Sequence, residues 1–203
     1  MKSIQIILLS AMTTLFFPGL SSSFAESCGS HGKESQKDAK HHGEMKKELT
    51  KHGPFKKVPM MDSKFLDGFY SNYLGIQAAF AGDDLKSAKT STEKLWKTVK
   101  DLKSEGDEKA FIAHLKESVS GISKADGIDK ARDNFFHLSN LTIALLEQNK
   151  YNGDFKALVF HCPMAFNNKG ANWLQSVEGT KNPYYGKSML ACGKKTRTIT
   201  PKE

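Results

Sequence analysis

Apolar side chains recur at three- and four-residue steps through most of the chain between Asp62 and Asn149. This spacing places them along one face of an α-helix, with polar residues on the other face. Three breaks interrupt the pattern, at Gly82-Asp83-Asp84, Ser104-Glu105-Gly106-Asp107 and Asp126-Gly127. Short loops between successive helices favour antiparallel neighbours. The sequence therefore predicts an all-α fold, an antiparallel four-helix bundle.

The predicted inward faces are rich in aromatic and branched side chains. Phe69 and Tyr73 belong to the inward stripe of the first helix, and Leu95 and Trp96 to that of the second. After Asn149 no strand period is convincing, although residues 155–160 are compatible with a short extended piece. We expect the remaining chain to form a loop segment rich in Cys and Met that packs on the bundle.

The first 25 residues have the pattern of a cleaved secretory signal. Lys2 supplies a positive start, an apolar run follows over residues 4–17, and Ser23-Phe24-Ala25 offers small residues for cleavage. The run is too short to span a membrane comfortably. A lipid anchor on Cys28 is disfavoured, because Ala25-Glu26-Ser27 is a poor approach to an acylated cysteine. We expect a periplasmic protein without a transmembrane segment in its mature form.

We divide the mature chain into three parts. Residues 26–60 are rich in lysine and histidine and poor in apolar side chains, which predicts a disordered tail. Weak metal binding by this tail and a plain polar linker are both compatible with its composition. Residues 61–193 form the helical domain, and residues 194–203 form a basic tail. The lysines are spread along the sequence and are not clustered with aromatic residues, which argues against nucleic acid as a partner.

Two cysteine–methionine pairs mark the ends of the segment that follows the helices. Cys162 and Met164 stand at one end, and Met189 and Cys192 at the other. Thiolates and thioethers are the soft ligands that select monovalent copper over harder cations. If a loop brings the two pairs together, they make a small sulfur-rich site. The sequence therefore predicts a metal site at these four residues, with Cu(I) as the expected ion and silver as a further candidate.

Two histidines are added to this site on chemical grounds. His161 precedes Cys162, and His137 lies on the fourth predicted helix, over which the last segment must fold. A lone histidine on a helix is more often structural than a ligand. The competing interpretation of the cysteines is a disulfide between Cys162 and Cys192. Loop closure would stabilise the fold by about 3.5 kcal/mol, close to the ~4 kcal/mol of a metal at 1,000 times its dissociation constant. Residue types favour the metal, since a disulfide has no use for Met164 and Met189.

The final segment also carries a family resemblance. The stretch His-Cys-Pro-Met-Ala-Phe-Asn-Asn-Lys-Gly-Ala-Asn-Trp that begins at His161, and Asn-Pro-Tyr-Tyr-Gly-Lys-Ser-Met-Leu-Ala-Cys-Gly that ends at Gly193, resemble a bacterial domain-of-unknown-function family. That family occurs alone or fused to the periplasmic adaptor subunits of copper and silver efflux pumps. The resemblance runs from about Phe65 to Gly193. It implies an all-helical exported domain associated with copper handling.

Two functions follow as expectations. The first is a periplasmic copper-binding protein, a scavenger or metallochaperone linked to copper homeostasis that passes its ion to an efflux adaptor. The alternative is a helical interaction module of the cell envelope, stapled by a disulfide and without metal. We do not expect an enzyme, because the sequence shows no Cys-x-x-Cys redox pair, nucleophile elbow or phosphate loop.

Overall fold

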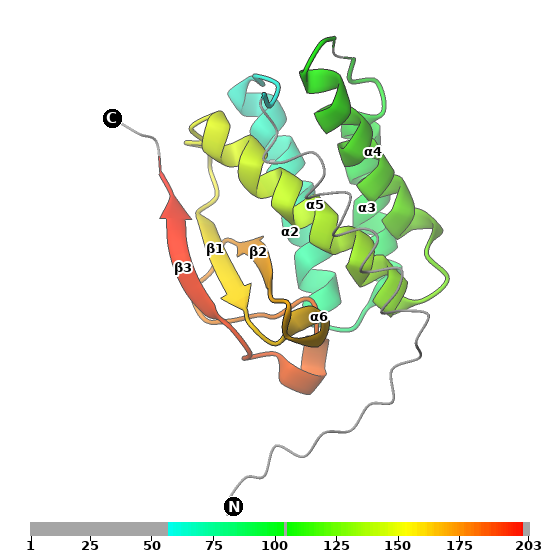
Figure 1. Ribbon diagram of the computed structural model, residues 1–203, viewed down its shortest axis with the longest axis vertical. Coiled ribbons are helices and arrows are strands. Elements are labelled where there is room, and N and C mark those ends of the chain that lie inside the picture. The colour runs from blue at the N-terminus through cyan, green and yellow to red at the C-terminus, as the bar shows by residue number, and fades with distance from the viewer. Residues whose placement is uncertain (1–56, 104, 201–203) are drawn as a thin grey trace, which may run out of the picture. The chain divides into compact units, whose positions relative to one another are not determined.

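The computed structural model of the protein describes residues 57–103 and 105–200. Within this part the chain forms four long helices, and consecutive helices run in opposite directions (Figure 1). Each helix packs on the next one along the chain, and the first also contacts the fourth. The four predicted helices are thereby confirmed. They are α2 (Ser63–Ala81), α3 (Leu85–Val99), α4 (Glu108–Lys124) and α5 (Ile128–Gln148).

Aspartate side chains cap the first two helices. The Asp62 carboxylate accepts a hydrogen bond from the Phe65 backbone N–H at 2.8 Å, and Asp84 does the same for Ser87 at 2.8 Å. These bonds satisfy donors that a helix leaves unpaired at its first turn. One predicted inward residue differs, since Trp96 is 37 % exposed.

A three-stranded antiparallel sheet follows the helices, so the all-α prediction is wrong. The strands are β1 (Ala157–Cys162), β2 (Ala171–Gln175) and β3 (Lys194–Ile199), in the order β2-β1-β3. The predicted basic tail at 194–203 therefore contains a strand. β1 shows no alternation of polar and apolar residues because it is buried along nearly its whole length, and such a strand has a continuous apolar run. β3 lies at the edge, where polar side chains are tolerated.

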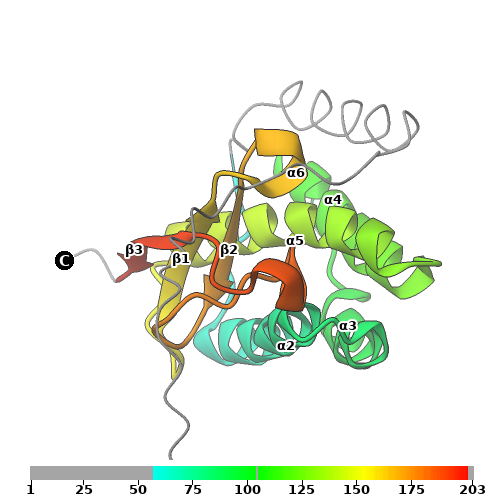
Figure 2. The same ribbon diagram turned by 90° about the horizontal axis from the view of Figure 1, so that it is seen from below.

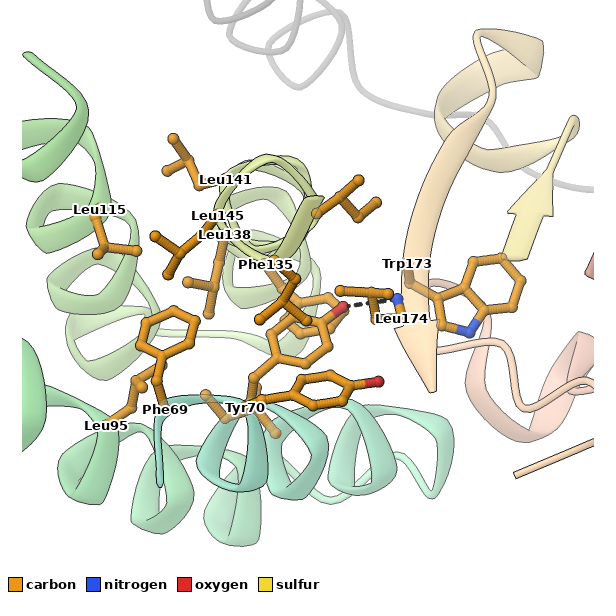
Figure 3. Packing of buried hydrophobic residues seen from close by; sticks show 14 of the residues in the cluster. Phe69, Tyr70, Leu95, Leu115, Phe135, Leu138, Leu141, Leu145, Trp173 and Leu174 are labelled. Atoms are coloured by element: carbon orange, nitrogen blue, oxygen red, sulfur yellow. Dashed lines mark hydrogen bonds between the residues drawn. The ribbon is translucent and has the colours of Figure 1, made fainter. Parts of the chain in front are cut away.

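The sheet covers the side of the bundle formed by α2 and α5 (Figure 2). Neighbouring residues of β2 point to opposite sides, with Leu174 toward the helices and Trp173 away from them (Figure 3). Trp173 lies opposite Phe160 of β1, and their rings stack with centroids 5.5 Å apart. The face turned away from the helices is thus covered as well, by the chain between β2 and β3.

A buried hydroxyl joins the helices to the sheet. Tyr73 Oη, on α2, accepts a hydrogen bond from the Leu174 backbone N–H at 3.0 Å (Figure 3, dashed line). The same oxygen is 2.9 Å from Ser139 Oγ of α5. Burial raises the pKa of Tyr73 far above its usual value, so this hydroxyl stays protonated. One tyrosine therefore ties two helices and a strand at a single point.

Several predictions about the N-terminal part lie outside the described residues. These are the signal peptide at 1–25, Cys28 and most of the tail at 26–60. The last residues of that tail are described, and Val58 is buried there against the end of α5, where its N–H donates to Gln148 Oε1 at 3.3 Å. Among the described helices, none combines the length and the apolar character needed to cross a membrane.

Candidate metal site

The thiols of Cys162 and Cys192 lie 3.1 Å apart. Cys162 ends β1 and is fully buried, whereas Cys192 precedes β3 and is half-buried, and both carry free thiols. The separation exceeds the ~2.05 Å of a disulfide bond. It is shorter than the ~3.8 Å expected of two thiolates on one tetrahedral ion with metal–sulfur bonds of about 2.3 Å. The observed separation therefore lies between those of the two states.

Strand pairing brings these two cysteines together. Cys162 lies opposite Ala171 of β2, and the chain returns past the other edge of β1 through Gly193 into β3. Gly193 has a φ of 119°, which favours glycine, and a Cβ there would lie 2.7 Å from the Trp173 ring and 2.8 Å from the His161 carbonyl oxygen. Only a glycine lets the chain pass this close to β1, directly after Cys192.

The buried side chain of Asn182 holds the loop that carries Cys192. Its Nδ2 donates to the Cys192 carbonyl at 2.8 Å, and its Oδ1 accepts from the Tyr184 backbone N–H at 2.8 Å. The Asn182 backbone N–H also donates to the Leu190 carbonyl at 2.9 Å. These bonds satisfy every group of a polar side chain that is 0 % exposed. The position of the Cys192 backbone is therefore fixed from within the loop.

A second buried amide organises the chain just after β2. Gln175 Oε1 accepts from Trp173 Nε1 at 3.0 Å, and its Nε2 donates to the Gly179 carbonyl at 2.6 Å. Thr180 Oγ1 then donates to the carbonyl of Gly193 at 3.0 Å. The loop is thus tied to β2 at one end and to the residue that follows Cys192 at the other.

Arg132 of α5 ties the same loop to the bundle. Its Nε donates to the Pro183 carbonyl at 2.7 Å, and its Nη2 donates to the Phe80 carbonyl at 2.9 Å and to Asp83 Oδ1 at 2.6 Å. The Lys187 backbone N–H donates to the other Asp83 oxygen at 2.9 Å. The hydrogen bond from Arg132 keeps the pKa of Asp83 below its usual value. Sequence analysis missed this arginine, because an arginine beside a helix stripe is normally exposed.

The two methionines lie on the segments that flank the thiols. Met164 immediately precedes the short turn α6 (Ala165–Asn168), is 42 % exposed, and its carbonyl accepts from Tyr185 Oη at 2.7 Å. Met189 ends the 3-10 helix η1 (Gly186–Met189) and is half-buried, and its carbonyl accepts from the Cys192 N–H at 3.0 Å. Neither methionine is a core residue of the bundle.

The turn after Met164 has a left-handed backbone. Phe166, Asn167 and Asn168 have φ values of 54°, 57° and 61°. Asparagine tolerates this region, whereas phenylalanine adopts it only when its surroundings require it. The Phe166 ring packs on Phe136 and on Tyr184, with centroids 5.2 Å apart in each case. This aromatic packing holds the turn, and with it the backbone of Met164.

His161 and His137 are the two histidines predicted to belong to the site. His161 neighbours Cys162 on β1 and so points to the other face of the sheet, where its Nδ1 lies 2.9 Å from Asn172 Oδ1. His137 is half-buried on α5, with its ring 5.2 Å from that of Phe136. The structure therefore brings the two thiols together, sets the two methionines on adjoining segments, and turns His161 away from the thiols.

The thiol of Cys192 is the weaker acid that this arrangement creates. Burial, with the adjacent Cys162 thiol as the next cause, raises the pKa of the Cys192 thiol to about 11. A metal ion that binds here must displace protons. Within residues 57–103 and 105–200, no group of three or more His, Cys, Asp and Glu side chains is placed to hold a metal. Within the described residues, sulfur ligands beyond the two thiols would come from methionines.

The fold and the site together define a four-helix domain with a small antiparallel sheet that carries a thiol pair. Residues 69–153 match a family model described as "Protein of unknown function (DUF3347)". The match runs from within α2 through α5 and ends before β1, so it supports the resemblance expected for the helical part. No curated protein and no solved structure matches the chain.

Proposed function

We propose that this protein is a periplasmic copper-binding protein, a scavenger or metallochaperone, that holds Cu(I) between Cys162 and Cys192. The observation that carries the proposal is the 3.1 Å separation of the two thiols, from residues 30 positions apart in the chain. Thiolates are soft ligands that favour monovalent copper, and silver has the same preference.

Met164 and Met189 are the proposed additional ligands. Met164 is exposed and Met189 is half-buried, so neither thioether is held inside the core. Neutral thioethers add no charge and bind less tightly than thiolates, which suits a protein that must release its ion. The transfer partner that we propose is a periplasmic adaptor of a metal efflux pump, as the family resemblance implies.

The unequal burial of the two thiols supports a transfer role. Cys162 is buried beneath the loop, whereas Cys192 is half-buried and begins the approach to the exposed strand β3. An ion would reach Cys192 and the exposed Met164 first, and Cys162 would complete its coordination. Ligand exchange with a partner would follow the reverse order.

Titration with Cu(I) under anaerobic conditions tests the proposal. The chain lacking residues 1–25 is reduced and titrated against a chromophoric Cu(I) chelator. One ion per chain is expected, and either Cys162→Ser or Cys192→Ser should weaken binding by roughly a hundredfold or more, since a thiolate ligand is lost. A Met164→Ala, Met189→Ala double variant should weaken it less. Stoichiometric binding that survives both cysteine variants would defeat the proposal.

Matched controls separate this site from the rest of the chain. Cys28→Ser removes the third cysteine, and Met60→Ala removes a methionine that is 74 % exposed and lies before α2. Both variants should keep the affinity of the unmodified chain. If Cys28→Ser abolishes binding, the metal belongs to the N-terminal part of the chain.

A disulfide-stapled interaction module of the cell envelope is the second candidate function. It is favoured by the same 3.1 Å separation and by the full burial of Cys162, which suit a bond between the two sulfurs. Mass spectrometry of freshly isolated protein, without reductant, distinguishes the candidates. A complete Cys162–Cys192 disulfide that persists when copper is supplied would support the module, and it should raise the unfolding free energy by about 3.5 kcal/mol.

A further inference from the structure

The charges of the described chain are divided unevenly between its two layers. Residues 57–154, which form the helices, carry 14 Lys and Arg and 15 Asp and Glu. Residues 155–200, which form the sheet and its loops, carry seven Lys and Arg and one acid, Glu178. Within the described residues, the excess positive charge thus belongs to the sheet layer, although the lysines are spread along the whole sequence. A one-sided basic surface attracts acidic partners.

Strand β3 concentrates this charge at an open sheet edge. Its first five residues, Lys-Lys-Thr-Arg-Thr from Lys194 to Thr198, are all exposed. In the described part of the chain, β3 pairs only with β1, so its other edge has no strand partner (Figure 1). An open edge presents a row of backbone donors and acceptors that a further strand can use.

The charges on β3 restrict which strand can be added. Lysine on an edge strand discourages pairing with another copy of the same strand, since like charges opposite each other are unfavourable. The β3 cations already reach carboxylates within the fold. Lys195 Nζ lies 2.7 Å from Glu178 Oε1 on one side, and Arg197 Nη2 lies 2.8 Å from Glu147 Oε1 on the other. Because the register shifts between Val159 and Phe160, Lys195 and Arg197 lie opposite neighbouring residues of β1, which face opposite sides of the sheet. Carboxylates on either face of an incoming strand would thus lie near a cation.

We propose that β3 is a docking edge for an acidic, extended segment of a partner protein, which adds to the sheet as a fourth strand. Backbone hydrogen bonds along the edge would give affinity, and carboxylates that alternate along the segment would give specificity. The N-terminal part of this chain is a poor occupant, because residues 26–56 carry seven Lys and Arg against five acids. A second copy is disfavoured by the lysines themselves.

The position of this edge links it to the thiol pair without depending on metal. Lys194 follows Cys192 by two residues and lies opposite His161 in the strand register. A segment docked along β3 would thus end beside the loop that carries Cys192. Binding of such a segment does not need the thiols, so it can be measured on reduced, metal-free protein. Failure of metal binding and failure of docking are then separate results.

Peptide binding tests the docking edge. A short fluorescent peptide that alternates glutamate with valine or threonine is titrated at low salt into the reduced chain lacking residues 1–25. We expect binding that weakens with added salt and that slows amide hydrogen exchange in residues 194–199. Lys194→Glu with Lys195→Glu should weaken binding by roughly tenfold or more, since attraction becomes repulsion. The control is the double variant Lys94→Glu with Lys97→Glu, which makes the same charge change at exposed positions of α3. It should change the affinity for the peptide by about twofold at most.

Two further probes decide between a strand and other acidic partners. A peptide methylated on its backbone nitrogens keeps its charge and loses its strand donors, so it should bind much more weakly. If it binds equally well, or if the α3 control weakens binding as much as the β3 variant, strand addition is wrong. Vesicles of phosphatidylglycerol that bind in place of the peptide, with exchange in β3 unchanged, would also overturn the proposal. Lys194→Gln with Lys195→Gln, which avoids new carboxylates, should give an intermediate loss.

Discussion

Cys162 and Cys192 touch, yet only Cys192 is open to solvent. The two thiols of the metal-free protein therefore differ in their access to reagents in solution. Cys162 is shielded by the loop, so a reagent in solution meets Cys192 first. Since burial and the neighbouring thiol raise the pKa of Cys192 to about 11, few thiolates are present at neutral pH.

Alkylation of Cys192 by iodoacetamide in reduced, metal-free protein should therefore be slow at pH 8. A free thiol titrates near pH 8.5, so the thiolate fraction at pH 8 is about two orders of magnitude lower for Cys192. The rate of Cys192 alkylation should rise steeply up to about pH 11. The raised pKa stabilises the fold below pH 8.5, and this contribution is lost as the pH rises through about 11. Peptide mass spectrometry gives the rate at each cysteine.

The variant Cys162→Ser provides the control for this measurement. It removes the thiol neighbour and leaves the burial of Cys192, so the pKa should fall partway and the rate at pH 8 should increase. A Cys192 rate equal to that of a free thiol in the unmodified protein would contradict the arrangement described above.

At the scale of the elements, the sheet docks on α2 and α5 through both apolar packing and one buried polar contact. Leu174 and Phe135 are fully buried at this contact, and the Tyr73 hydroxyl between them accepts from a strand N–H. Replacing Tyr73 with phenylalanine removes the hydroxyl and leaves the aromatic ring that packs at this contact.

Tyr73→Phe should lower the free energy of unfolding by about 1–3 kcal/mol, because it leaves the buried Leu174 N–H without its acceptor. Urea denaturation followed by circular dichroism measures the change. Tyr185→Phe is the matched control. Its hydroxyl donates to the Met164 carbonyl at the exposed end of the loop, so its loss should cost about 0.5 kcal/mol or less. Equal costs for the two variants would contradict a structural role for Tyr73.

The helices could be predicted from the sequence because their signals are local. The stripes have the 3.6-residue period, and Asp62 and Asp84 stand where caps are needed. The sheet could not, because β1 and β2 are buried along most of their length and the edge strand β3 is polar, so none of the three shows a regular alternation. Trp96 was assigned inward from spacing alone, although a position at the margin of a stripe need not be buried.

The site was predictable in its residue types and less so in its geometry. The sulfur pattern led to Cys162 and Cys192, which the fold brings into contact. His161 is next to Cys162 in sequence, but adjacent residues of a strand face opposite ways, so its orientation depends on β1, which the sequence did not predict. The groups that hold the loop, Asn182 and Arg132, act through contacts distant in sequence, which spacing cannot reveal.

At the scale of the whole molecule, Arg132 joins two helices to the loop that carries Cys192. It lies on α5 and binds the carbonyl groups at the end of α2 and in the loop that leads to Cys192. Its side chain is 9 % exposed. The stability of the helical layer and the geometry of the thiol pair therefore depend on the same guanidinium.

Arg132→Ala should lower the unfolding free energy by about 3 kcal/mol, since buried acceptors lose a charged donor. It should also speed alkylation of Cys192, because the loop is released from α5. Arg132→Lys keeps the charge but not the planar guanidinium group. It should therefore restore little of the unfolding free energy and little of the protection of Cys192 from alkylation. The control is Lys130→Ala, whose exposed side chain lies 3.6 Å from Asp126 and should contribute about 0.5 kcal/mol or less. Unfolding in urea and alkylation rates measure both effects.

The strand order has a consequence for how the chain assembles during synthesis. β1 is the central strand, but its second neighbour, β3, is the last strand along the chain. A nascent polypeptide can complete its helices and pair β1 with β2 while Lys194–Ile199 is still being made. The sulfurs of Cys162 and Cys192 can come into contact only after Cys192 has been added, so an incomplete chain that ends before it holds Cys162 without its partner thiol.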